Sequence, residues 1–220
     1  MPESDLSPHY TGERGAAYAQ WQLSMSRGMG PIRARVFRPY VKPTYTVLDF
    51  GCGSGEMLLA LACARRLGVE PNTAALAIAR TNGIEGFASI DQVEPSSVDV
   101  VVSNHALEHA TRPLDELRGI RSVLKPSGRL VLAIPLDDWR TQRHYDPRDI
   151  NHHLYAWTPQ LLGNLLTDAG FRFDRIRVST HAWPPGYQRL IHLPGWAFDP
   201  MCVAWAFLRR RRQLQVVAWP

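Results

Sequence analysis

Three glycines follow a short apolar segment and are spaced to hold a ligand through the backbone. The segment from Asp49 to Gly55 reads Asp-Phe-Gly-Cys-Gly-Ser-Gly. Glycine adopts positive φ readily and lets a ligand approach the backbone where a Cβ would collide. The amides that open a following helix direct partial positive charge toward such a ligand. We therefore predict cofactor contacts along this turn, at Asp49, Gly51, Cys52, Gly53 and Gly55.

The spacing of these glycines argues against a dinucleotide. A dinucleotide fingerprint requires G-x-G-x-x-G, but the third position is Glu56 when counted from Gly51 and Leu58 when counted from Gly53. A carboxylate beside the turn would also repel a pyrophosphate. S-Adenosylmethionine (SAM) carries no phosphate, and its sulfonium and amino acid group match Asp49 and a mixed polar turn better.

Other polar residues stand where later strands are expected to end. Glu70 closes the second strand, where a carboxylate can accept hydrogen bonds from ribose hydroxyls. Ser89 and Ile90 follow the third strand and are expected to border the adenine. Asn104 follows the fourth strand and is expected at the methionyl part, with His105 at the edge between cofactor and substrate.

The segment between Pro135 and Thr158 is the richest in residues suited to proton transfer and anion binding. Histidine is the usual base near neutral pH, so we predict His152 or His153 as a general base, with Asp149 orienting it. Paired histidines that only cap the next helix or pack against Trp157 are the alternative. A metal held by the same three residues lacks a tight ligand spacing, and we expect none. The predicted substrate contacts are Arg140, Arg143, His144 and, in the N-terminal segment, Tyr10.

The elements that must position these residues alternate between short β-rich and helical runs. This pattern predicts an α/β fold with a doubly wound, mostly parallel, seven-stranded, Rossmann-like sheet and helices on both faces. The expected strands lie at 46–50, up to Val69–Glu70, at 98–102, 129–134, 171–179 and 213–217. The expected helices lie at 57–64, at 73–81 with Asn72 as N-cap, from Pro113, and from Thr158 to Ala169 with Gly170 closing; a turn is expected at 125–128.

Two segments lie outside this alternation. Residues 1–45 are expected to be largely helical, for instance at 31–37. With Tyr10, Tyr18 and Trp21 they are expected either to form a lid over the site or only to pack as an amphipathic helix on the domain. Residues 46–220 form the cofactor-binding domain, with a helical insertion at about 180–212. That insertion is rich in tryptophan and ends in Arg209–Arg212. It suits a membrane surface or an apolar substrate tail, and core packing or a dimer contact equally.

Composition limits the class of protein. The net charge of +5 and the pI of about 9.4 suit anionic partners, yet no interleaving of aromatic and basic residues favours nucleic acid. The three cysteines, Cys52, Cys63 and Cys202, are unpatterned, which fits a reducing cytoplasm. No signal peptide or bilayer-spanning run is visible, so we expect a cytoplasmic protein, with peripheral membrane contact through the insertion as an open alternative.

Four segments, in this order, resemble the motifs of the class I (seven-strand) SAM-dependent methyltransferases: 47–55, 68–71, 104–109 and 124–130. The chain is most similar to the group around the quinone-biosynthesis and bacterial sugar or glycan methyltransferases. The resemblance implies SAM as cofactor, with contacts at Gly51, Gly53, Glu70 with Pro71, and near Asn104. The segment 88–91 departs from the Gly-Asp pair of many members, which leaves the adenine-side residue open.

The resulting functional expectation is methyl transfer to a small-molecule acceptor, a hydroxyl of a sugar, glycan or lipid-linked intermediate. Carbon methylation of an isoprenoid quinone precursor would need apolar walls and no base. A SAM-binding interaction protein without catalysis is a third interpretation. A nucleic-acid or protein methyltransferase ranks last, because no Asn-Pro-Pro-Tyr or Asp-Pro-Pro-Tyr motif follows the fourth strand.

Overall fold

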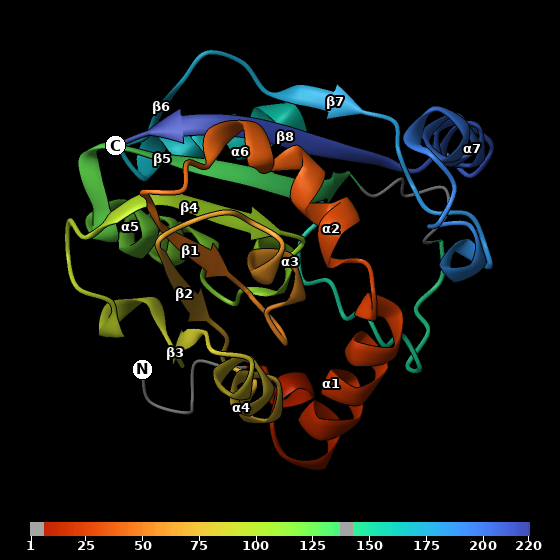
Figure 1. Cartoon of the computed structure of the whole chain (residues 1–220), viewed down its shortest axis with the longest axis horizontal. Helices are drawn as coiled ribbons and strands as arrows, with labels where there is room; N and C mark the ends of the chain where they lie inside the picture. The colour runs from red at the N-terminus through yellow and green to blue at the C-terminus, as the bar shows by residue number, and fades with distance from the viewer. Residues whose placement is uncertain (1–6, 137–142) are drawn as a thin grey trace.

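The computed structural model describes residues 7–136 and 143–220, which form one sheet flanked by helices (Figure 1). The strand order is β3-β2-β1-β4-β5-β8-β6, and β7 also pairs with β8. The first five of these strands pair in parallel, whereas β8 runs antiparallel to β5, β6 and β7. The strands are β1 (Thr46–Phe50), β2 (Arg65–Val69), β3 (Glu85–Phe87), β4 (Val98–Asn104), β5 (Leu124–Leu136), β6 (Arg172–Phe173), β7 (Arg177–Ser179) and β8 (Arg212–Trp219).

Helices cover both faces of the sheet, as predicted. One face packs on α5 and α6, and the other on η3, α3 and α4. This two-sided cover explains the nearly continuous apolar runs of the central strands. The helices are α1 (Gly12–Ser26), α2 (Gly30–Arg33), α3 (Glu56–Leu59), α4 (Thr73–Thr81), α5 (Pro113–Val123), α6 (Pro159–Asp168) and α7 (Gly195–Leu208); the short 3-10 turns include η2 (Pro8–Tyr10), η3 (Ala34–Val36), η4 (Arg38–Tyr40), η5 (Ile90–Gln92), η6 (Leu107–His109) and η8 (Tyr187–Arg189).

The order of the strands places the binding crevice. The chain leaves β1 toward β2 on one side, while β4 lies on the other side of β1. Ligands of open α/β sheets bind at the carboxyl ends of the strands at such a switch point. The turn after β1 and the residues after β4 therefore lie at the same edge.

Local signals fixed several helix ends correctly. The Asn72 side chain accepts hydrogen bonds from the amides of Ala74 and Ala75, so it is the N-cap of α4. Thr158 caps α6 through the amide of Leu161, and Gly170, at a φ of +86°, follows its end.

The helix predicted over 57–64 is wrong in length, because α3 is a single turn, Glu56–Leu59. The connection must return to the start of β2, where the amide of Ala64 already bonds to the Tyr45 carbonyl. The N-terminal segment fills the space that a longer helix would cover: Ala34 and Phe37 are fully buried in the core of this face. Residues 7–45 thus contribute to the core as well as to the crevice.

Two further strand predictions need correction. The expected strand over 171–179 is two short strands, so the sheet has eight strands instead of seven. From Phe173 to Arg177 the chain advances four residues against three on β8, so the pairing with β8 is interrupted between the two short strands. The strand expected at 129–134 begins earlier, at Leu124, and the expected turn at 125–128 lies at a register shift within it, where the chain advances five residues from Leu124 to Arg129 against two from Val98 to Val100.

The insertion packs on the N-terminal segment. Tyr187, Phe198 and Cys202 form a small apolar cluster with Met29, and the Tyr187 hydroxyl donates to the Met25 carbonyl at 2.7 Å. Part of the insertion therefore packs into a buried cluster, as one of the two alternatives predicted. Among the described helices, none combines the length and apolar character needed to cross a membrane.

Candidate functional site

The turn after β1 adopts a backbone conformation that favours glycine at three positions. Gly51, Gly53 and Gly55 have φ of +77°, +54° and +84°. The amides of Gly51 and Cys52 donate to the Val69 carbonyl at 2.8 and 3.1 Å, which ties the turn to β2. A Cβ on Gly51 would lie 2.2 Å from the Cβ of Ala106, so this approach of the turn to the segment after β4 requires glycine.

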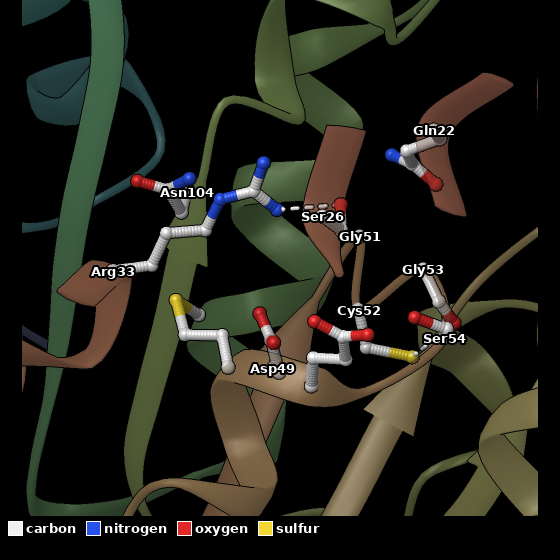
Figure 2. A pocket seen from close by; sticks show the side chains of 11 residues that line it. Gln22, Ser26, Arg33, Asp49, Gly51, Cys52, Gly53, Ser54 and Asn104 are labelled. Carbon is white, nitrogen blue, oxygen red and sulfur yellow. Dashed lines mark hydrogen bonds between the residues drawn. The ribbon is translucent and has the colours of Figure 1, made fainter. Parts of the chain in front are cut away.

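A small cavity beside this turn contains side chains of opposite charge. Figure 2 shows Asp49, Arg33 and Asn104 around it, with Arg33 donating to Ser26. That hydrogen bond is 2.9 Å long, from Nη1 of Arg33 to Oγ of Ser26. Within the described residues, Oδ1 of Asp49 and Nε of Arg33 are buried without a hydrogen-bond partner. The cavity therefore offers an acceptor and a donor of opposite charge to one ligand.

Burial sets the protonation of the charged groups here. Burial and, to a lesser extent, the neighbouring Glu70 raise the pKa of Asp49 to about 8, although Arg33 opposes both effects. Burial also lowers the pKa of Arg33. A ligand cation near Asp49 would favour its carboxylate form and lower that pKa.

Glu70 is buried at the end of β2 and organises the turn. Its two carboxylate oxygens accept from the amides of Gly53 and Asn72, each at 2.9 Å. Burial raises the pKa of Glu70 although these two hydrogen bonds lower it. A carboxylate has about four acceptor positions, so Glu70 can still accept from ligand hydroxyls at the cavity it lines.

A second, larger cavity of about 340 Å³ adjoins the first and shares Gln22 and Gly51 with it. Its floor comes from the ends of β1 and β2 and its cover from the N-terminal segment. Its walls include Tyr10, Tyr18, Glu70, Pro71, Ser89, Gln92, His105, Ala106 and His109. The N-terminal segment predicted as a lid thus supplies part of this wall.

A cluster of histidines closes one side of the larger cavity. The Tyr10 hydroxyl lies 2.7 Å from Nδ1 of His109, and the ring of His153 lies 5.0 Å from that of His109. Burial and, to a lesser extent, the neighbouring His153 lower the pKa of His109 to about 3. His109 is therefore neutral at physiological pH.

The loop that carries the predicted base lies against this cluster. The Asp149 carboxylate accepts from the backbone amides of Asn151 and His152, both at 3.1 Å, so its described hydrogen bonds shape the loop rather than orient an imidazole. The His152 ring stacks on His9 at 4.4 Å and lies 3.3 Å from the Ser7 hydroxyl. Neither histidine lines the larger cavity itself: His152 contacts the lining residue Ser7, and His153 packs on the lining residue His109.

Several predicted contacts lie elsewhere. Gly55 lies outside both cavity linings, where an added Cβ would collide with Ile84, and Ile90 packs into the core against Gly119 of α5. Arg143 and His144 are exposed. Arg140 lies outside the described residues. The remaining predicted cofactor residues line one or both cavities: Asp49, Gly51, Cys52, Gly53, Glu70, Pro71, Ser89, Asn104 and His105.

Sequence reasoning missed Gln22, Arg33 and Glu108. Gln22 lines both cavities and Arg33 lines the smaller one, but they belong to a segment that no motif ties to the turn after β1. Glu108 is fully buried. Its only sequence signal is its position within Asn104–His109, the segment after β4.

Comparisons with known proteins agree with this geometry. A family model described as a methyltransferase domain matches residues 21–175. The chain is 33% identical over 117 residues to the ubiquinone biosynthesis O-methyltransferase of Xanthomonas campestris pv. campestris strain B100, covering 46% of each protein. It is 36% identical over 104 residues to the ribosomal protein L11 methyltransferase of Aliivibrio fischeri strain MJ11, covering 42% of this chain and 34% of that protein. The chain thus spans less than half the length of these relatives.

Solved structures share the fold. A chain from the complex between the Haloferax volcanii Trm112 methyltransferase activator and the putative methyltransferase aligns with a TM-score of 0.69 at 21% identity, covering 95% of this chain and 98% of that one. A SAM-dependent methyltransferase from Archaeoglobus fulgidus aligns with a TM-score of 0.63 at 21% identity, covering 92% and 100%.

The match over residues 21–175 shows that the chain belongs to the methyltransferase domain family. The predicted class, a class I SAM-dependent methyltransferase with a Rossmann-like sheet and SAM as cofactor, is confirmed.

Proposed function

We propose that this protein transfers the methyl group of SAM to a hydroxyl of a small molecule, such as a sugar, a glycan or a lipid-linked intermediate. The observation that carries the proposal is the pair of adjoining cavities that share Gln22 and Gly51. One suits an amino acid zwitterion and the other suits a nucleoside, and SAM consists of these two parts joined at a sulfonium.

The residues of the smaller cavity fit the methionyl part. Asp49 would hold the ammonium group, and Arg33 the carboxylate, through the buried polar atoms that have no described partner. Glu70 would accept from the ribose hydroxyls, and Ser89 and Gln92 would border the adenine. A Cβ at Gly53 would lie 2.9 Å from Oε1 of Gln22, so the bare backbone keeps room at the join.

The acceptor would reach the methyl group from the side of the larger cavity that the histidines close. When bound, SAM supplies an activated methyl group, so the acceptor oxygen bonds to carbon as the carbon–sulfur bond breaks and the hydroxyl proton leaves. The protein's task is to align the acceptor and exclude water, and to remove that proton. We keep His152 or His153 as the predicted base. The relatives named as O-methyltransferases favour an oxygen acceptor.

The test is calorimetry followed by turnover. SAM should bind the purified chain, and isotope-labelled methyl should appear in one member of a panel of glycans, lipid-linked sugars and quinone precursors. Labelling at a ring carbon, unaffected by His152→Asn or His153→Asn, would establish carbon methylation instead. SAM binding without turnover of any acceptor would favour the interaction protein. Absence of SAM binding, with uptake of a nicotinamide or flavin compound, would overturn the proposal.

A second candidate function, peripheral membrane contact, rests on the outer side of α7. Trp196, Phe207 and Leu208 are 81%, 79% and 73% exposed, and the exposed Arg209–Arg212 follow directly. Apolar side chains beside a basic run suit an anionic lipid surface, where a lipid-linked acceptor would reside.

Vesicle cosedimentation checks this surface. Binding to vesicles with phosphatidylglycerol should exceed binding to pure phosphatidylcholine, and should fall with salt and in a Trp196→Ser/Phe207→Ser variant. A matched control replaces the exposed Leu154, far from α7 in sequence, with serine. Equal sedimentation of all proteins with both vesicles would exclude the contact.

A further inference from the structure

Glu108, His109 and His153 bring three potential metal ligands together at the wall of the larger cavity. One ligand atom from each lies within 4.8 Å of the other two. The first two residues come from η6 after β4, and the third from the loop before α6. The amide of Leu154 donates to the Glu108 carbonyl at 2.9 Å, so the two segments are fixed to each other beside the cluster.

The hydrogen bonds of Tyr10 define which nitrogen of His109 is available. The Tyr10 hydroxyl lies 3.2 Å from the carbonyl of Asn151 and 3.4 Å from that of His152. Carbonyls only accept, so all three contacts are satisfied together in the tautomer in which the hydroxyl donates to the carbonyls and its oxygen accepts from Nδ1–H of His109 at 2.7 Å. The lone pair of His109 is then on Nε2, as in metal-binding histidines whose other nitrogen is held by a hydrogen bond.

That lone pair faces a carboxylate. Nε2 of His109 lies 3.9 Å from Oε1 of Glu108, and Nδ1 of His105 lies 3.8 Å from the same oxygen. A distance of 3.9 Å is too long for a hydrogen bond, but two ligands at about 2.1 Å from one ion can be this far apart.

The backbone is strained on both sides of this cluster. His105 and His152 have φ of +55° and +50°, a region that non-glycine residues adopt at a cost and that recurs at functional sites. His105 lies just before η6 and His152 just before His153, so the two strained residues flank the cluster in sequence.

We propose that Glu108, His109 and His153 bind a divalent transition metal ion, with His105 able to complete the site. Two imidazoles and one carboxylate suit zinc, manganese or ferrous iron better than magnesium or calcium, which prefer oxygen ligands. Tyr10 is then a positioning residue for His109. His105 and His109 line the larger cavity, so an open coordination position would face the acceptor.

The catalytic role of this ion rests on the proposed methyl transfer. A metal-bound hydroxyl loses its proton more readily, so the acceptor would give its proton to solvent water before methyl transfer and react as an alkoxide, without the general base assigned above. His153 would then act as a ligand, and His152 would be dispensable.

The test titrates chelator-treated protein with Zn²⁺, Mn²⁺ and Co²⁺ by calorimetry. One ion per chain is expected, and bound Co²⁺ should show a visible absorption spectrum. Glu108→Gln and His153→Asn should weaken binding by about tenfold or more, and Tyr10→Phe, which removes only the hydroxyl beside His109, by about tenfold. His192→Asn, an exposed histidine of the insertion, is the matched control. SAM binding by each variant reports whether the cofactor site remains folded.

The outcomes separate the two proposals. Failure of the wild-type protein to bind any of these ions, or equal binding by wild type and His153→Asn, overturns the metal site. Metal binding without SAM binding preserves the site and overturns the methyltransferase proposal. Methyl transfer that survives complete chelation overturns the catalytic role, whereas loss on chelation, with recovery on adding back one of the ions, supports it.

Discussion

The two sides of the crevice are assembled in different ways. The cofactor side is mostly one continuous stretch, Asp49 to Gly55, tied to β2 by the amides of Gly51 and Cys52. The histidine wall is assembled from three distant segments: η2 with Tyr10, the residues after β4, and the 143–157 loop. A local motif can therefore define the cofactor class, whereas the acceptor chemistry depends on how distant segments pack.

The largest expected effect tests the cofactor side, which is mostly formed by the continuous stretch Asp49 to Gly55. Gly51→Ala places a Cβ 2.2 Å from that of Ala106 at a φ of +77°, so it must move the segment after β4. We expect SAM affinity to fall by about 100-fold or more, roughly 2.8 kcal/mol. Calorimetric titration of SAM measures this.

Gly83→Ala is the matched control. Its φ is +83°, but a Cβ there would contact nothing within 4 Å, so it carries only the left-handed backbone cost of about 1–2 kcal/mol in stability. Equal losses of SAM affinity in the two variants would show that the close approach of Gly51 to Ala106 is unimportant.

An intermediate effect tests the contribution of a distant segment to the cofactor side, because Arg33 of the N-terminal segment lies beside the turn after β1. Arg33→Met removes the guanidinium from the smaller cavity. A charged hydrogen bond contributes about 1.5–3 kcal/mol, so SAM affinity should fall about 10- to 100-fold. Binding of 5′-methylthioadenosine, which lacks the amino acid part, should not change.

The control for that variant is Arg35→Met. Arg35 forms an exposed ion pair with Asp199 and lies outside both cavity linings. Its replacement should therefore leave the affinities for SAM and for 5′-methylthioadenosine unchanged. A parallel loss of both ligands in Arg33→Met would mean that the residue supports the fold instead of the methionyl carboxylate.

The smallest expected effect is a pH dependence on the cofactor side. Because burial raises the pKa of Asp49 to about 8, this group is largely protonated in the free protein near neutral pH. A ligand cation favours the carboxylate, so binding releases a proton. SAM affinity should therefore rise with pH below about 8, by at most about tenfold per pH unit, and level off above it.

Titrations in two buffers of different ionisation enthalpy measure this proton release, and Asp49→Asn should reduce it. The same pKa has a second consequence for the free protein. A folded-state pKa above the unfolded one means that the folded state binds more protons, so this group's contribution to stability decreases as pH rises from about 4 to 8. An unchanged release in Asp49→Asn would assign it to another group, such as Glu70.

Local sequence signals predicted much of the fold and the cofactor side. The Asn72 cap and the glycines of the turn after β1 depend on neighbours a few residues away, and both were confirmed. The helix over 57–64 was wrong because a distant segment covers that part of the sheet, with Phe37 fully buried there. The apolar residues of 57–64 indicated a buried segment, but the sequence does not show which other segment covers this part of the sheet.

The sequence by itself determined the class of this protein. Its glycines, the carboxylate at the end of β2 and the order of the strands are all encoded in short stretches, because backbone conformation and strand alternation are local properties. Only the tertiary structure decided that Arg33 enters the smaller cavity, and that Glu108, His109 and His153 meet at the wall of the larger one. Side chains far apart in the chain become neighbours through packing of the whole domain, which no single segment specifies.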